Sequence, residues 1–340
     1  MDADAKLHLV KKNAVELLGE DELREKLGSK KTVSAYLGRA TTGPLHLGHV
    51  ISTSKLLDLQ KAGMKTILLL ADIHAALDDQ KAKWDELDAR VEYTKKCLEL
   101  SFDWETPPKF VRGSDYQLSK EYVLDALKMA SFATIDRAKR AASEVTRMKN
   151  PKVSEVIYPI FQALDEQYLD VDLQIGGLDQ RHILVFDREY LPLLGYDKRA
   201  ELMMPLVTSM NGPGVKMSSS LPETNLKVYD SEETIRRKIE RAYCPIDTAK
   251  DNFILQVMSM VVFAEQEKFV VERDEKFGGD VVFDSYLALE RSFLNKDIHP
   301  MDLKNAVAAY LIRKFARVRK YFEENSDMLE ALGPAFLPTR

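Results

Sequence analysis

The distribution of hydrophobic and polar positions predicts a parallel sheet early in the chain. Residues 33–38 form a β-prone run that ends in glycine, a Thr/Gly/Pro turn follows at 41–44, and helical periodicity extends from about 46 to 61. Residues 65–72 are a continuous apolar run of strand length, which is typical of a strand buried on both faces. Strand, turn, helix and buried strand make a βαβ unit, so we predict an α/β fold with a parallel sheet.

The same reading extends to the rest of the chain. Further strand candidates, separated by helical sequence, are 109–112, 170–177 and 201–207. Turn-forming glycines and proline followed by serines indicate a loop at 211–220, and after residue 230 β-prone runs are rare.

These patterns predict three parts. An N-terminal helical arm occupies residues 1–30, an α/β domain occupies 31–225, and a mainly helical domain occupies 226–340. Within the α/β domain, a charged, helix-periodic connective segment is inserted at about 78–150.

Composition limits the class of protein. Of 340 residues, 45% are hydrophobic and 30% charged, which is typical of a globular, soluble chain. The net charge of -5 argues against a nucleic-acid binder, but basic residues gather on two helical stretches. Each stretch either binds phosphates or is a solvated helix face. The first comprises Arg137, Lys139, Arg140, Arg147 and Lys149, and the second comprises Arg313, Lys314, Arg317, Arg319 and Lys320.

Several classes of site are not indicated. Cys97 and Cys244 match no metal or redox spacing, and the six histidines show no zinc pattern, so we expect no metal site and reduced thiols. No secretory signal opens the sequence, and its longest apolar run, at 67–71, is far shorter than a membrane span. We therefore expect a cytoplasmic protein with no membrane partner.

The first segment that is a candidate for binding or catalysis is YLGRATTGPLHLGH at 36–49. A strand there ends in a tight turn and a helix opens with two histidines, where unpaired backbone amides favour an anion. Gly48 would let a nucleotide lie against the backbone, and His46 and His49, three residues apart on one helix face, could donate to phosphate oxygens. The alternative is a helix start with two incidental polar residues.

The second segment is KMSSS at 216–220, after Gly-Pro-Gly at 212–214. A lysine and several hydroxyls on a loop suit a departing polyphosphate, although an exposed serine-rich loop is the better explanation of the string when it is taken alone. Together, however, the two segments resemble the signature pair of class I aminoacyl-tRNA synthetases, which implies a Rossmann-like catalytic domain and ATP as substrate.

A third segment narrows the resemblance. YPIFQALDEQY at 158–168, followed by QIGGLDQR at 174–181, is similar to the tyrosine pocket of tyrosyl-tRNA synthetases of the archaeal and eukaryotic cytosolic type. Tyr158, Gln162 and Asp165 fall on one helix face; an amphipathic helix exposing polar residues is the alternative. Other segments with this resemblance, from LLADIHAALDD at 69–79 to HPMDLKNAV at 299–307, extend it over about residues 30–320.

The resemblance implies roles for particular residues. It implies that Tyr36 and Asp165 hold the phenol hydroxyl of tyrosine and that Tyr158, Gln162 and Gln180 line the amino-group side of the pocket. The expected ATP-binding residues are Gly38, Thr42, His46, Gly48, His49 and Lys216. The catalytic group comprises His46, His49, Lys216, Ser218, Ser219 and Ser220.

The implied reaction needs no side-chain nucleophile. The tyrosine carboxylate attacks the α-phosphorus of ATP, with Mg²⁺ held chiefly by the phosphates, and the tyrosyl group then passes from the adenylate to the 3′ end of tRNA(Tyr). The resemblance places Arg181 at the acceptor end and Phe277, His299 and Asp302 around the anticodon, read by the C-terminal helical domain. Alternatively, Phe277 is a core residue and Asp302 a helix cap.

Three further expectations complete the interpretation. The resemblance implies a homodimer. A tryptophanyl-tRNA synthetase is the closest alternative, disfavoured because indole has no hydroxyl for Tyr36 and Asp165. A non-catalytic, synthetase-like RNA-binding protein is the other alternative, and the intact His46, His49 and Lys216 argue against it.

Overall fold

The chain divides into two compact units in the computed structural model, which describes residues 1–29, 32–146, 152–217 and 221–339. Unit 1 comprises Met1–Thr42, Asp58–Lys95 and Thr106–Leu206. Unit 2 comprises Gly43–Leu57, Lys96–Glu105 and Val207–Arg340. Two early segments thus pack with the C-terminal third of the chain. The predicted functional domains, 31–225 and 226–340, stay predictions.

Unit 1 is built on one six-stranded sheet with the order β1-β6-β5-β2-β3-β4. Its strands are β1 (Glu16–Leu18), β2 (Ser34–Ala40), β3 (Lys65–Ala71), β4 (Lys109–Arg112), β5 (Leu173–Gly177) and β6 (Ala200–Met204). All neighbours pair in parallel except β1, which runs antiparallel to β6. The predicted α/β fold and parallel sheet are confirmed.

The sequence suggested a helical N-terminal arm, but the arm also contains a strand. Helices α1 (Ala3–Lys11) and α2 (Glu20–Gly28) flank β1, which adds to the free edge of β6. The three residues of β1 are too few to show a period, and pairing with an existing strand determines their conformation. The arm is therefore part of unit 1.

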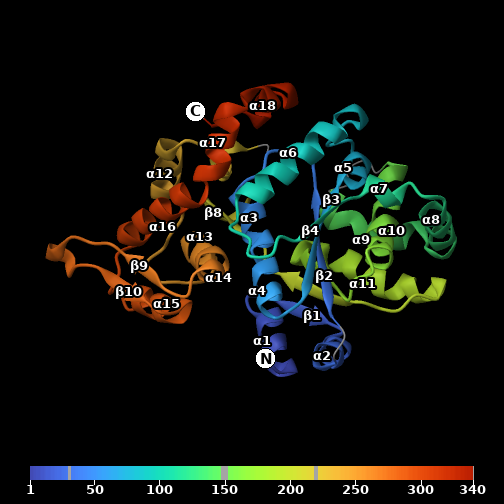
Figure 1. Cartoon of the computed structure of the whole chain (residues 1–340), viewed down its shortest axis with the longest axis horizontal. Helices are drawn as coiled ribbons and strands as arrows, with labels where there is room; N and C mark the ends of the chain where they lie inside the picture. Colours follow the sequence, from blue (N-terminus) through green and yellow to red (C-terminus); the bar gives the residue numbers. More distant parts are fainter. Residues whose placement is uncertain (30–31, 147–151, 218–220, 340) are drawn as a thin grey trace. The chain divides into compact units, whose positions relative to one another are not determined.

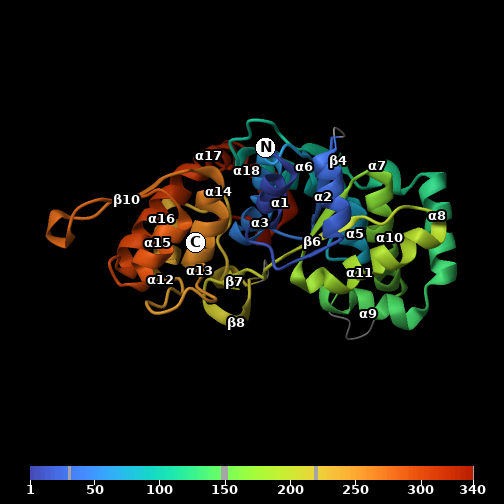
Figure 2. The same ribbon diagram turned by 90° about the horizontal axis from the view of Figure 1, so that it is seen from below.

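Helices pack against this sheet and against one another. Figures 1 and 2 both show α8 to α11 gathered together on one side of the strands. The other helices with residues in unit 1 are α4 (Lys55–Lys61), α5 (Asp72–Leu77), α6 (Leu87–Leu100), α7 (Ser114–Gln117), α8 (Lys120–Phe132), α9 (Ile135–Thr146), α10 (Val153–Tyr168) and α11 (Arg181–Tyr190), with 3₁₀ turns at Trp84–Glu86, Leu178–Gln180 and Leu191–Leu194.

The helix expected from residue 78 begins later. Asp79 and Gln80 have φ values of 50° and 52°, a left-handed conformation that an α-helix cannot contain. The helical segment therefore starts at Trp84–Glu86 and continues as α6.

Unit 2 is mainly helical and contains two small hairpins. The predicted loop at 211–220 is wrong for 212–216, where β8 (Gly212–Lys216) pairs with β7 (Thr208–Ser209). Gly212 and Gly214 have positive φ values, which made this glycine-rich segment read as a loop. The second hairpin, β9 (Phe269–Val271) with β10 (Val281–Phe283), interrupts the helical sequence.

The remaining elements of unit 2 are helical. They are α3 (Leu47–Thr53), α12 (Glu232–Arg241), α13 (Phe253–Val257), a π-helical turn (Met258–Val262), α14 (Phe263–Glu265), α15 (Tyr286–Leu294), α16 (Pro300–Lys314), α17 (Ala316–Glu324), α18 (Ser326–Leu332) and 3₁₀ turns at Pro222–Thr224, Glu275–Phe277 and Pro334–Phe336. No helix in the described part of the chain is long and apolar enough to cross a bilayer.

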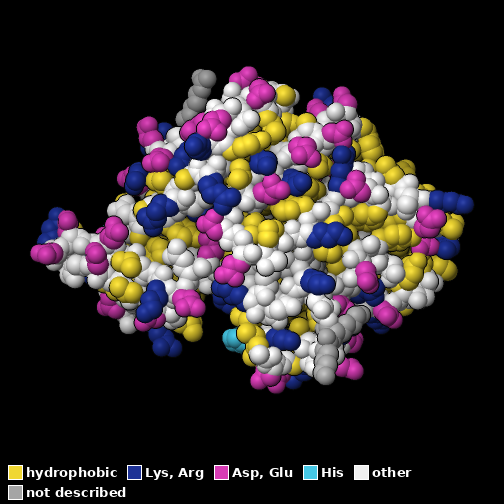
Figure 3. All heavy atoms as spheres, in the orientation of Figure 1, with side chains coloured by type: hydrophobic (Ala, Val, Ile, Leu, Met, Phe, Trp, Pro, Cys, Tyr) yellow, Lys and Arg dark blue, Asp and Glu magenta, His cyan; other side chains and the backbone are white. Residues whose placement is uncertain are grey.

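The surface mixes charges of both signs. Figure 3 shows basic and acidic side chains interspersed over the face in view, with hydrophobic side chains exposed among them at the end that carries α7, α8 and α10. The net charge of the chain is small because acidic and basic side chains nearly balance, and on this face they are interspersed.

Candidate functional site

Asp165 is the centre of a buried polar cluster in unit 1. One carboxylate oxygen, Oδ1, accepts hydrogen bonds from Tyr116 (2.7 Å), Gln117 (2.7 Å) and Tyr122 (3.0 Å). The other, Oδ2, is buried and accepts none from the described residues; Nε2 of His74 lies 3.5 Å away. Burial raises the pKa of Asp165 to about 7, against the lowering effect of its three donors.

His74 is neutral at physiological pH because burial lowers its pKa to about 4. Its ring meets that of Tyr158 edge-on, with centroids 4.8 Å apart. The cluster thus offers an acceptor, Oδ2 of Asp165, in a dry environment where an unmatched polar atom is costly.

Tyr36 lies on β2 directly opposite Gln174 of β5. Its hydroxyl donates to Oε1 of Gln174 at 2.7 Å, and its pKa is raised far above the usual range, first by burial and then by the negative charge of Asp165. Among the described contacts, Tyr36 therefore bonds to Gln174 while Asp165 bonds to other groups.

The α10 face expected from the sequence is buried. Tyr158, Gln162 and Asp165 are 6%, 8% and 1% exposed, so the alternative of an amphipathic helix showing polar residues to water is wrong. Gln180 folds over Gly176 of β5, where a Cβ would come within 2.8 Å of its Oε1. Glycine at this position leaves the space that the Gln180 side chain occupies.

Site reasoning from the sequence missed five members of this cluster: His74, Tyr116, Gln117, Tyr122 and Gln174. Each lies inside a segment that resembles the family, so this resemblance could have pointed to these residues. Their roles depend on contacts over roughly forty or more positions of sequence, which spacing does not reveal.

Three buried carboxyl groups lie beside this cluster. Oxygens of Glu166 (α10), Asp187 (α11) and Glu201 (β6) lie within 4.8 Å of one another, and no amide, hydroxyl or basic group of the described structure donates a hydrogen bond to their six oxygens. Burial raises the pKa of Glu166 to about 8 and raises those of Asp187 and Glu201 well above the usual range. At neutral pH this group therefore retains protons.

The histidine corner, residues 45–49, lies in unit 2. His46 is the N-cap of α3: its Nδ1 accepts from the Gly48 amide, and Nδ1 of His49 accepts from the His46 amide, both at 3.2 Å. The two rings stack with centroids 3.9 Å apart. Both Nδ1 atoms accept hydrogen bonds, so the Nε2 atoms carry the protons of the neutral rings.

Gly48 joins the two signature segments by packing. A Cβ at Gly48 would lie 2.8 Å from Sδ of Met217 and 3.0 Å from the His46 ring. Met217, the second residue of KMSSS, is 7% exposed. Any side chain at this position would therefore have to displace the Met217 sulfur or the His46 ring.

Other expected nucleotide contacts are placed in part. Gly38 lies within β2, and the Thr42 carbonyl accepts from Arg90 at 2.8 Å. Lys216 ends β8, but its side chain lies outside the described part, as do Ser218, Ser219 and Ser220.

The expected tRNA contacts are exposed or at element ends. Arg181 opens α11 and binds Glu16 of β1 through two hydrogen bonds, 2.7 and 2.9 Å long. Phe277 is 60% exposed at the 3₁₀ turn of the β9–β10 hairpin, so it is not a core residue. His299, and not Asp302, is the N-cap of α16.

The two basic stretches contain side chains with different roles. Arg137 pairs with Glu189, while Lys139 and Arg140 are exposed; Arg147 and Lys149 lie outside the described residues. Lys314 is buried against Glu265, and Arg319 is buried with Glu232 as its partner, so neither is available to phosphates as placed. The second stretch is therefore partly structural.

Comparisons with known proteins agree with this arrangement. A family described as "tRNA synthetases class I (W and Y)" matches residues 29–316. The "Tyrosine--tRNA ligase" of Archaeoglobus fulgidus is 45% identical over 94% of this chain and 98% of its own length. "Tyrosine--tRNA ligase, cytoplasmic" of Danio rerio is 40% identical over 95% of this chain but only 61% of that longer relative.

A solved structure shows the same likeness. The tyrosyl-tRNA synthetase of Archaeoglobus fulgidus, crystallised in complex with L-tyrosine, superposes with a TM-score of 0.88 at 44% identity, covering 94% of this chain and 99% of that one. A match of this extent at this identity shows the family as well as the fold. The chain therefore belongs to the class I tRNA synthetases for tryptophan and tyrosine, among the tyrosine–tRNA ligases.

Proposed function

We propose that this chain is a tyrosine–tRNA ligase that activates L-tyrosine with ATP and transfers the tyrosyl group to the 3′ end of tRNA(Tyr). The observation that carries the choice of tyrosine is the buried Oδ2 of Asp165, which accepts no hydrogen bond from the described residues. A phenol hydroxyl supplies the missing donor, whereas the benzyl ring of phenylalanine leaves the acceptor unmatched.

Activation proceeds by direct displacement. The tyrosine carboxylate attacks the α-phosphorus of ATP, the bond to pyrophosphate breaks, and tyrosyl-adenylate forms. Mg²⁺ enters with ATP, held chiefly by its phosphate oxygens. The chain contributes positioning and stabilisation of developing negative charge, so no side-chain nucleophile is needed.

For tyrosine, we assign Asp165 and Tyr36 to the phenol end and Tyr158, Gln162 and Gln180 to the amino-group side. The Tyr36–Gln174 hydrogen bond supports a refinement, because it fixes the orientation of the Tyr36 hydroxyl. Gln174 would then position Tyr36 without touching the substrate.

For ATP, we assign Gly38, Thr42 and the histidine corner with its Gly48. The Nδ1 hydrogen bonds at 3.2 Å support this role, since they fix the tautomer with the proton on Nε2, the form that can donate to a phosphate oxygen. Lys216 and Ser218, Ser219 and Ser220 would bind the leaving pyrophosphate.

For tRNA, we assign Arg181 to the acceptor end, and Phe277, His299 and Asp302 of the C-terminal domain to the anticodon. The exposed ring of Phe277 supports this role, because an exposed aromatic ring at a hairpin tip can stack on an unpaired base. Domain 31–225 would perform the nucleotide chemistry and domain 226–340 would read the anticodon.

The protein is proposed to be a cytoplasmic homodimer. Support for a self-association surface comes from the exposed apolar side chains on and beside α8: Leu118 (64% exposed), Val123, Leu124, Leu127 (65%), Phe132 and Ile135 (70%). Apolar side chains grouped at one surface in this way mark interfaces.

The direct test is ATP–pyrophosphate exchange with purified protein and single amino acids. Exchange driven by tyrosine, with little by phenylalanine and none by tryptophan, is the expected result. Exchange driven by tryptophan would replace the tyrosine assignment, and the absence of exchange with every amino acid would favour the non-catalytic RNA-binding alternative.

A further inference from the structure

A stretch of backbone that borders the histidine corner also holds the C-terminal segment of the chain. Residues 226–228 run antiparallel to 45–47: the Leu47 amide donates to the Leu226 carbonyl at 2.8 Å, the Val228 amide donates to the Leu45 carbonyl at 3.3 Å, and His46 and Lys227 face each other as a bridge pair. The backbone position of His46 therefore depends on residues 226–228. All of these residues belong to unit 2.

Side chains of the same stretch bind residues 335–339, which we name the C-terminal strap. Nζ of Lys227 donates to the carbonyl of Ala335 at 2.7 Å and also to that of Leu337. The Tyr229 hydroxyl donates to the Phe336 carbonyl at 2.7 Å. Phe336 itself is 3% exposed, so the strap is anchored by an apolar side chain as well as by its backbone.

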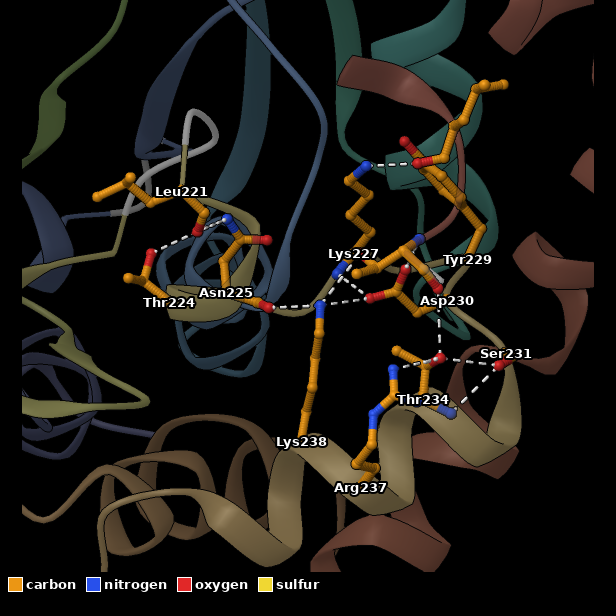
Figure 4. Close-up of polar contacts among 12 residues, drawn as sticks. Leu221, Thr224, Asn225, Lys227, Tyr229, Asp230, Ser231, Thr234, Arg237 and Lys238 are labelled. Atoms are coloured by element: carbon orange, nitrogen blue, oxygen red, sulfur yellow. Dashed lines mark hydrogen bonds and ion pairs between the residues drawn. The ribbon is translucent and has the colours of Figure 1, made fainter. Parts of the chain in front are cut away.

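The end of the strap is held by charged groups. The Thr339 amide donates to Asp230 at 2.7 Å, and Asp230, which is fully buried, also accepts from Nζ of Lys238 at 3.0 Å. Figure 4 shows Lys238 extending from α12 to the Asn225 carbonyl and to Asp230, the residue between Tyr229 and the start of α12. The backbone on both sides of Lys227 is thus tied down.

Lys227 joins the C-terminal strap to the histidine corner: its side chain binds the strap and its backbone faces the corner. It is 4% exposed, and burial lowers the pKa of its ammonium group. A buried ammonium held by two backbone carbonyls is costly to leave without partners, so its side chain and the strap hold each other in one position. Its backbone at the same time faces His46.

We propose that Lys227 is a positioning residue for amino-acid activation, acting by clamping residues 226–228 between the C-terminal strap and the histidine corner. The inference rests on the proposed function, because it takes His46 and His49 as the groups that hold ATP. Loosening the clamp lets the histidine corner shift, and displacements of about 1 Å can cost a reaction up to a hundredfold.

The variant K227M keeps the length of the side chain and removes its donors. The expected result in tyrosine-driven pyrophosphate exchange is a kcat/KM for ATP about tenfold lower, with the KM for tyrosine unchanged within about twofold. K227R, which retains several N–H donors, should recover most of the loss. Y229F, which removes one strap hydrogen bond and keeps the ring, should show a smaller loss in the same direction.

The matched control is K314M. Lys314 is another lysine of unit 2 with a buried side chain, 4% exposed, but it binds Glu265 and contacts the Phe102 ring rather than the strap. Its loss should lower the melting temperature without changing the ATP parameters. If K227M and K314M lower the melting temperature alike and neither changes the ATP parameters, the strap is merely structural and the proposal is overturned.

Exchange by the unsubstituted protein separates the two ideas. If wild-type chain shows no tyrosine-driven exchange, the proposed function fails. If it shows exchange but K227M and Y229F match wild type in kcat and in KM for ATP, the proposed function stands and only the role of Lys227 is lost.

Discussion

Oδ2 of Asp165 and Nε2 of His74 lie 3.5 Å apart in unit 1, and both atoms are buried with no hydrogen bond to any described residue. Burial holds the carboxyl pKa near 7 and the imidazole pKa near 4, so the pair is not a conventional ion pair at neutral pH. The carboxylate has an acceptor site left for a ligand because its neighbours satisfy only Oδ1.

Asp165→Asn should reduce the preference for tyrosine over phenylalanine. The amide replaces an ionisable acceptor, so the discrimination should narrow by roughly tenfold to a hundredfold, which corresponds to about 1–3 kcal/mol. The measurement is kcat/KM in pyrophosphate exchange for both amino acids. An unchanged ratio of the two values would remove Asp165 from the phenol site.

Glu201→Gln should stabilise the protein at pH 8. The folded-state pKa values of Glu166, Asp187 and Glu201 lie above the usual ones. The folded protein therefore keeps protons that the unfolded chain releases. As a result, the stability of the wild-type protein falls as pH rises from about 4.5 to 8. Removing one carboxyl group relieves part of this cost, of the order of 1–3 kcal/mol.

The check is thermal unfolding at pH 5 and pH 8. The gain should be present at pH 8 and should shrink at pH 5, where all three wild-type groups are protonated. Glu189→Gln, at an exposed position on the same helix α11 as Asp187, is the control: it removes only the surface ion pair with Arg137, so its effect should be small and the same at both pH values. Equal gains at both pH values would rule out repulsion among the carboxyl groups as the cause.

Gly48→Ala should lower activity by displacing Met217 or the His46 ring, which a new Cβ would approach to 2.8 and 3.0 Å. We expect kcat in pyrophosphate exchange to fall about tenfold while the KM for tyrosine is kept. Gly28→Ala serves as control, since its Cβ would meet Ala3 at an ordinary 3.6 Å. If adding Met217→Ala restores no activity, the packing explanation fails.

Phe277→Ala should weaken tRNA charging without affecting activation. Loss of a stacking ring costs about 1–3 kcal/mol per base, or roughly tenfold to a hundredfold in KM for tRNA. Aminoacylation of tRNA(Tyr) and pyrophosphate exchange should be measured side by side. Val282→Ala, 56% exposed on the same hairpin, is the control, and equal effects of both variants on charging would argue against stacking by Phe277.

Leu127→Glu should convert a dimer to a monomer, because it places a charge in the middle of the exposed apolar face of α8. Light scattering coupled to size-exclusion chromatography gives the mass directly. Leu206→Glu, an equally large change at a leucine 53% exposed elsewhere in unit 1, should leave the mass at that of wild type. A wild-type chain that elutes as a monomer would contradict the dimer.

Local patterns were sufficient for the five parallel strands of the sheet and for the identity of the signature segments. The apolar run at 65–72 is strand β3, Lys109–Arg112 is strand β4, and the helix predicted after the 41–44 turn is present as α3 and α4. These elements are visible because a buried strand must be apolar along its length and a helix start needs a turn before it. Strands β1 and β8 were missed because pairing, and not residue preference, makes them strands.

The sequence by itself determined the class of fold and the candidate residues for binding and catalysis. These are Tyr36, Asp165, the two histidines of the corner, and Lys216. Only the tertiary structure decided the partner of each group. It pairs Tyr36 with Gln174, surrounds one oxygen of Asp165 with three donors, packs Met217 against Gly48 and ties Lys227 to the C-terminal strap. The reason is physical: a periodic pattern is a local property of the chain, whereas hydrogen bonding and burial depend on neighbours that folding brings from distant positions.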